Sequence, residues 1–187
     1  MEGFAEPWQE FQFRLKDDLL RQVRKSGQPE NEVVRMVGLV FARPESGLGK
    51  TEIIPHLSYF HQRSADFITF YFIGYADSRR TSGSKKVAEF AGREWTFDDW
   101  HFDDTRRVVE ARSKWRYSGS ADLILTNARL QPTLGNALGE LTADLDWASA
   151  ICADLEELKR CGAILSVERF FEDIFRYAES QDGRDPT

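Results

Sequence analysis

Two strongly apolar runs, residues 33–43 and 67–76, constrain the fold of this chain more than any other feature. The first is nearly continuous in apolar residues and ends before Pro44, as expected for a strand that is covered on both faces. The second is rich in aromatic and β-branched residues, which favour strands. Residues 51–64 between them carry a helical pattern, with Pro55 near the start, where proline is tolerated. Strand, helix and strand in this order predict a βαβ unit, whose two strands are parallel.

The rest of the chain supplies further helices and one more strand. Apolar residues recur at helical spacing from residue 7 to 25, and a third strand is expected at 121–126. Weaker patterns indicate a hairpin at 87–97 that turns near Gly92 and a helix at 103–115. A loop that contains Gly and Pro is expected to follow the third strand, through residue 143. Two C-terminal helices are expected, one capped by Asp146 and one by Ser166.

These elements predict an α/β fold: a small three-layer-like domain with a short, mostly parallel sheet, an N-terminal helix and two C-terminal helices. The length of 187 residues is typical of a single domain, 1–187. Residues 77–86 are polar and basic without periodicity, which predicts a mobile loop, and residues 180–187 are expected to form a disordered tail.

Composition narrows the classes of protein to which the chain can belong. The apolar runs are shorter than a membrane span, and the N-terminus does not have the pattern of a signal peptide, so we expect a cytoplasmic protein. The net charge of −6 argues against a nucleic-acid binder, because phosphate neutralisation needs clustered Lys and Arg. Cys152 and Cys161 are nine residues apart in a segment expected to be one helix; we expect reduced, semi-buried thiols.

The segment 44–51 ends in Gly-Leu-Gly-Lys-Thr, which resembles a fragment of a phosphate-binding loop between a strand and a helix. It departs from that motif at Pro44, which stands where the first glycine should be and has no N–H to donate. Ligands of open α/β sheets commonly bind at the carboxyl ends of strands. The candidate ligand contacts at the ends of the two apolar strands are therefore Arg43, Lys50, Thr51, Asp77, Arg79 and Arg80.

His56 and Arg63 fall near one face of the predicted helix 51–64 and form a second candidate ligand cluster, with ordinary helix packing as the alternative. His56 and His61 are five residues apart, which does not favour a shared metal. The run 95–104 mixes aromatic residues, four aspartates and His101, and its aspartates can either hold a metal or cap the following helix. Capping explains adjacent acidic pairs better, so we expect no metal and no cofactor.

Without a convincing catalytic pattern, the sequence favours a non-enzymatic module that binds another protein, such as an accessory subunit, an inhibitor or an immunity-type factor of a bacterial defence system. Trp95, Trp100 and Trp115 are candidate interface residues, although core packing explains them equally well. The alternative is an enzyme or sensor that binds a phosphate or nucleotide at 44–51. A weaker third hypothesis is RNA or DNA contact through the basic residues of 77–86.

Overall fold

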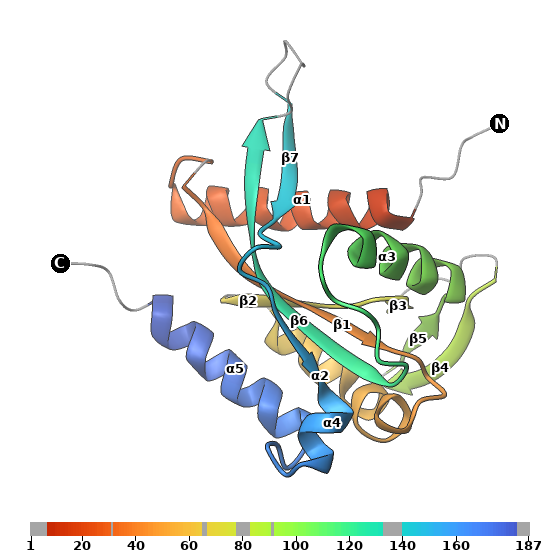
Figure 1. Cartoon of the computed structure of the whole chain (residues 1–187). Coiled ribbons are helices and arrows are strands. Elements are labelled where there is room, and N and C mark those ends of the chain that lie inside the picture. Colours follow the sequence, from red (N-terminus) through yellow and green to blue (C-terminus); the bar gives the residue numbers. More distant parts are fainter. Residues whose placement is uncertain are drawn as a thin grey trace.

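The computed structural model is an α/β fold with two sheets, and it describes residues 7–30, 32–64, 67–77, 83–90, 92–132 and 140–182 (Figure 1). The larger sheet contains β1 (Val34–Ala42), β2 (Ile68–Phe72), β6 (Ala121–Pro132), β7 (Leu141–Leu145) and β8 (Ile151–Asp154). The strand order is β2-β1-β6-β7. The strand β7 pairs with residues 128–132 of β6, and β8 pairs with residues 122–125 of β6. Within the described ranges β2 is therefore an edge strand of this sheet.

Helices cover both faces of the larger sheet. On one face lie α1 (Pro7–Ser26) and α3 (Asp99–Arg112), where Phe41 of β1 packs edge-on against Phe102 of α3. On the other face lie α2 (Leu57–Arg63) and α5 (Val167–Asp182), where Phe70 of β2 stacks on Phe171 of α5 with ring centres 4.6 Å apart. The short helix α4 (Leu155–Arg160) follows β8. Both faces of β1 are thus buried, as its continuous apolar run predicts.

The smaller sheet is antiparallel and consists of β3 (Tyr75–Ala76), β5 (Arg93–Phe97) and β4 (Lys85–Phe90), in that order. The hairpin predicted near Gly92 is confirmed, because β4 and β5 pair on either side of it. The chain passes from β2 into β3 at Gly74, whose φ of 86° places it in the left-handed region. A Cβ at Gly74 would lie 2.7 Å from the Phe97 ring, so both the turn and the close approach require glycine.

The predicted pairing of the two apolar runs is correct, since β1 and β2 are parallel with Met36 opposite Ile68. The segment between them is helical in three pieces: a π-helix at Gly49–Ile53, a 3-10 turn at Ile54–His56, and α2. The prediction of a mostly parallel sheet is wrong, because β6 runs antiparallel to β1, and β7 and β8 run antiparallel to β6. A strand buried on both faces has the same apolar pattern in either direction, so the sequence carries no sign of this reversal.

The C-terminal third differs most from expectation. The predicted loop up to residue 143 holds instead the second half of β6 and β7. Asp146 does not cap a helix; its backbone bonds to Asn127 and Thr126, and its carboxylate closes a turn with Ser149. The residues after this turn pair with β6 as β8, which places Cys152 in a strand.

Both cysteines are exposed rather than semi-buried, and Cys161 follows the last residue of α4. The cap of α4 is Asp154, which accepts a hydrogen bond from the Glu157 amide at 3.0 Å. The predicted cap of the last helix is confirmed, because Ser166 Oγ accepts the amide hydrogen of Arg169 at 3.2 Å.

Of the predicted mobile loop 77–86, residues 78–82 lie outside the described residues, and Lys85 and Lys86 begin β4. Of the predicted tail 180–187, residues 180–182 belong to α5 and the rest lie outside the described residues. Buried apolar side chains from both sheets form one contiguous cluster. None of the described helices is long and apolar enough to cross a membrane.

Candidate functional site

A groove of about 660 Å³ runs along the outer edge of β2; we call it the β2 groove. Nine consecutive residues, Thr69 to Asp77, line it. Successive side chains of a strand point to opposite faces, so a cavity over one face would touch every second residue. Four of these residues, Thr69 to Phe72, belong to β2, and contact with all four in succession means that the groove meets β2 from its edge.

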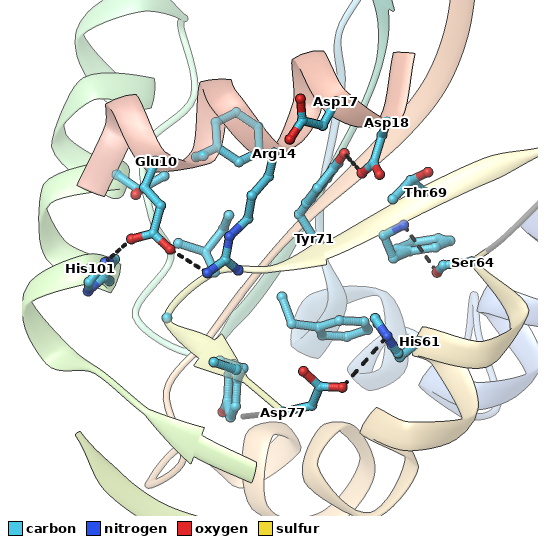
Figure 2. A pocket seen from close by; sticks show the side chains of 18 of the residues that line it. Glu10, Arg14, Asp17, Asp18, His61, Ser64, Thr69, Tyr71, Asp77 and His101 are labelled. Atoms are coloured by element: carbon cyan, nitrogen blue, oxygen red, sulfur yellow. Dashed lines mark hydrogen bonds and ion pairs between the residues drawn. The ribbon is translucent and has the colours of Figure 1, made fainter. Parts of the chain in front are cut away.

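The first wall of the β2 groove is the polar flank of α1, which carries Glu10, Arg14, Asp17 and Asp18 at helical spacing beside the buried Leu15 (Figure 2). Arg14 points into the groove and pairs with Glu10 one turn earlier. The Tyr71 hydroxyl of β2 donates a hydrogen bond to Asp18. Burial is the main cause that raises the pKa of Tyr71, so this hydroxyl stays a donor at neutral pH.

His101 of α3 joins this wall to the neighbouring helix. Its Nε2 lies 2.9 Å from Glu10 Oε2, and its Nδ1 lies 3.2 Å from Asp98 Oδ2. Partial burial raises the pKa of Glu10, but hydrogen bonds from His101 and Arg14 outweigh it, and the net effect is a lowered pKa. The Glu10 carboxylate is therefore held ionised between a histidine and an arginine.

The opposite wall comes from the end of α2 and from the smaller sheet, with His61, Ser64, Asp77 and Trp95. His61 Nε2 lies 3.9 Å from Asp77 Oδ2, and both side chains face the groove from the side opposite Arg14 (Figure 2). The Trp95 ring meets the His61 ring edge-on, and its Nε1 donates to Ser58 Oγ at 2.9 Å. Trp95 is 4% exposed, so it supports this wall from behind.

The candidate contacts around 44–51 lie away from the β2 groove and engage other protein groups. Arg43 donates to Asp99 at 2.6 Å and to both carboxylate oxygens of Asp103 at 2.8 Å. The Thr51 hydroxyl donates to the Gly47 carbonyl at 2.8 Å, and Lys50 is exposed. The guanidinium and the hydroxyl that a phosphate would need thus have protein acceptors, and a phosphate site here stays a prediction.

His56 and Arg63 both connect the 49–63 segment to α5. His56 Nδ1 lies 2.9 Å from the Glu52 carbonyl oxygen, and Nε2 lies 3.5 Å from Glu168. Arg63 bonds Glu172 and Glu179 and lies over the Phe175 ring. These contacts give both residues a packing role.

Among the candidate interface tryptophans, Trp100 is 54% exposed, whereas Trp95 and Trp115 are buried. Trp115 donates its Nε1 hydrogen to the buried carboxylate of Asp122. Arg79 and Arg80 lie outside the described residues. Of the candidate residues that the structure describes, the β2 groove brings together Asp77 and Trp95.

The aspartate-rich run 95–104 caps and braces α3. Asp98 is the N-cap and accepts the amide hydrogens of Trp100 and His101 at 2.9 and 3.0 Å. In the part of the chain that the structure describes, no group of three His, Cys, Asp or Glu side chains is arranged to hold a metal ion.

Glu10, Arg14, Tyr71 and His101 line the groove but were not predicted from the sequence as site residues. Glu10 and Arg14 flank the apolar stripe of a helix, a position that is usually only solvated, and Tyr71 lies in an apolar run. Their proximity depends on β2 being an edge strand, which the local sequence does not encode.

Comparison of the chain with protein-family models, with curated proteins and with solved structures finds no match.

Proposed function

We propose that this protein is a non-enzymatic interaction module, of the accessory-subunit, inhibitor or immunity-factor kind, which binds a partner protein in the β2 groove. The single observation that carries this proposal is that four consecutive residues of the edge strand β2, Thr69 to Phe72, line the groove. An uncovered strand edge is a template for pairing with another chain, and proteins usually blunt or cover such edges. Among the described residues no strand pairs with this edge of β2, and a partner protein would cover it.

Site-specific photocrosslinking tests this proposal. A benzophenone amino acid replaces Arg14 on one wall or Asp77 on the other, and the protein is irradiated in a lysate of its source cells. Arg24 serves as the control position, because it is exposed on the same helix as Arg14 but does not line the groove. We expect both groove positions to give the same covalent adduct with one protein, and Arg24 to give none. Absence of adducts at both groove positions, or equal adducts at Arg24, would contradict the proposal.

A further inference from the structure

The direction of the β2 backbone groups follows from two hydrogen bonds. The Ile73 amide donates to the Val40 carbonyl of β1 at 3.0 Å, whereas the Phe70 amide points away from β1 and donates to Ser64 Oγ at 3.1 Å. Backbone groups alternate in direction along a strand, so Phe72 faces outward as Phe70 does. The Phe70 carbonyl and both the amide and the carbonyl of Phe72 therefore face the groove, and none of these three groups forms a hydrogen bond with another described residue.

The walls of the groove decide what can reach these groups. α1 rises on one side and the end of α2 with the smaller sheet on the other, so the β2 edge lies on the floor (Figure 2). A second copy of this chain would carry its own β2 on the floor of an identical groove, and two recessed edges cannot meet. An isolated extended segment can enter, and the five residues of β2 offer it about 17 Å of edge.

The walls carry charges of both signs, and several of these charges are paired within the groove. Arg14 lies against Glu10, Arg21 against Asp18, and His61 near Asp77. Such a groove has no excess of one charge to attract a basic or an acidic segment. Recognition is therefore left to main-chain hydrogen bonds, as in strand addition.

We propose, resting on the function proposed above, that the β2 groove binds an extended peptide segment of the partner as an added strand, through the Phe70 carbonyl and both the amide and the carbonyl of Phe72. The segment belongs to a tail or loop, because a strand inside a folded sheet could not reach the groove floor. Its affinity depends weakly on salt, because the main-chain bonds are formed between uncharged groups.

The probe for this proposal is a phage-displayed library of random twelve-residue peptides, selected against the protein and counter-selected against Arg14→Trp. Arg14→Trp places a large ring in the groove, and Arg24→Trp is the matched control on the same helix outside it. We expect selected peptides to bind the wild type and Arg24→Trp equally and to bind Arg14→Trp at least about tenfold more weakly. If the library yields no peptide that distinguishes the two variants, strand addition is wrong.

A selected peptide is then synthesised with single N-methyl groups along its backbone. In strand addition every second N–H faces β2, where the carbonyls of Phe70 and Phe72 can accept, so we expect losses of about tenfold or more at two positions that are two residues apart and small effects between them. On binding, exchange of the Phe72 amide hydrogen should slow, while that of Tyr71, already paired with β1, should change little. Raising the salt concentration about tenfold should change the affinity less than about threefold.

Losses at every third or fourth position would indicate a helical ligand, and unchanged exchange at Phe72 would place the peptide elsewhere; either result overturns strand addition. Neither result changes what the photocrosslinking experiment shows, so strand addition can be wrong while partner binding in the β2 groove is right. Crosslinks at Arg14 and Asp77 without alternate N-methyl effects would support partner binding in the β2 groove and would overturn strand addition.

Discussion

Gly49 occupies a point where two stretches of backbone come closer than a side chain allows. A Cβ at this position would lie 2.1 Å from the Arg43 carbonyl oxygen, whereas a Cβ at Gly47 would have its nearest neighbour, a Glu156 side-chain oxygen, at 3.9 Å. The second glycine of the Gly-Leu-Gly-Lys-Thr segment is thus required by packing.

We therefore expect Gly49→Ala to lower the free energy of unfolding by about 2–4 kcal/mol, and Gly47→Ala to change it by less than about 1 kcal/mol. Urea denaturation of the two variants checks this. Equal stability of both would mean that the chain does not approach itself at Gly49. A nucleotide thermal-shift screen on Lys50→Ala and the wild type tests the phosphate hypothesis for the same segment.

Asp122 is a buried carboxylate, 1% exposed, on the α1 side of β6. It accepts hydrogen bonds from Trp115 Nε1 and the Ser118 amide, both at 2.9 Å, and from the Ser118 hydroxyl. Burial raises its pKa, against the lowering effect of the bonds from Ser118 and Trp115. The folded state therefore holds the Asp122 proton more tightly than the unfolded chain does.

Because its pKa is raised, Asp122 stabilises the folded state more at low pH than at neutral pH. Stability from a raised pKa is fully present below the unfolded value of 3.8 and is lost as the pH rises through the folded value. Asp122→Asn cannot titrate but keeps an acceptor for Trp115. We expect the wild type to lose stability relative to Asp122→Asn between about pH 3.5 and pH 7 in urea titrations.

Asp122→Ala leaves the donors of Trp115 and Ser118 without their acceptor, and should cost about 2–4 kcal/mol at either pH. A wild type that gains stability relative to Asp122→Asn as the pH rises would contradict a raised pKa.

At the scale of elements, Glu10 and His101 tie the start of α1 to the start of α3. Because the pKa of Glu10 is lowered in the folded state, its contribution to stability is present above the unfolded value of 4.5 and is lost as the pH falls through the folded value. We expect Glu10→Gln to be less stable than the wild type at about pH 7 and the difference to vanish in acid below pH 4.5. Urea midpoints at both pH values measure it.

Arg14→Gln is the matched control, because it removes the exposed partner of Glu10 and keeps the bond to His101. Its effect should be smaller, since exposed ion pairs contribute little. A constant difference between Glu10→Gln and the wild type across the pH range would show that the carboxylate charge is not what joins the two helices.

The sequence predicts elements that depend on local patterns well, and elements that depend on long-range pairing poorly. The β1–β2 pair and the hairpin at Gly92 were predicted from local apolar runs and turn residues, and the structure contains both pairings. The direction of β6 and the strand β8 depend on long-range pairing. Trp147, Ile151, Leu155 and Leu158 have the spacing of a helix face, yet residues 151–154 complete the sheet beside β6.

The same distinction applies to the candidate site. Asp77 follows an apolar strand and could be found from its position, whereas the approach of α1 to the β2 edge is set by the packing of whole elements. Sequence patterns therefore located the strand of the groove but not its α1 wall.

At the scale of the whole molecule, the two sheets share one core. Phe97 of the smaller sheet is fully buried, with ring centres 4.9 Å from Tyr75 and 5.6 Å from Phe102 of α3. Phe102 in turn meets Phe41 of the larger sheet at 5.9 Å. A continuous aromatic chain across the junction means that neither sheet can lose its packing without exposing part of the other.

We therefore expect one cooperative unfolding transition, with coincident midpoints for tryptophan fluorescence and far-UV circular dichroism. Phe97→Ala should lower the free energy of unfolding by about 3–5 kcal/mol and shift both midpoints together, because the cavity lies at the junction. Trp100→Phe, at an exposed position, is the control and should leave the midpoints unchanged. If the fluorescence transition of Phe97→Ala instead precedes the dichroism transition, the smaller sheet unfolds by itself, and the opposite wall of the β2 groove would then be a separately opening part of the molecule.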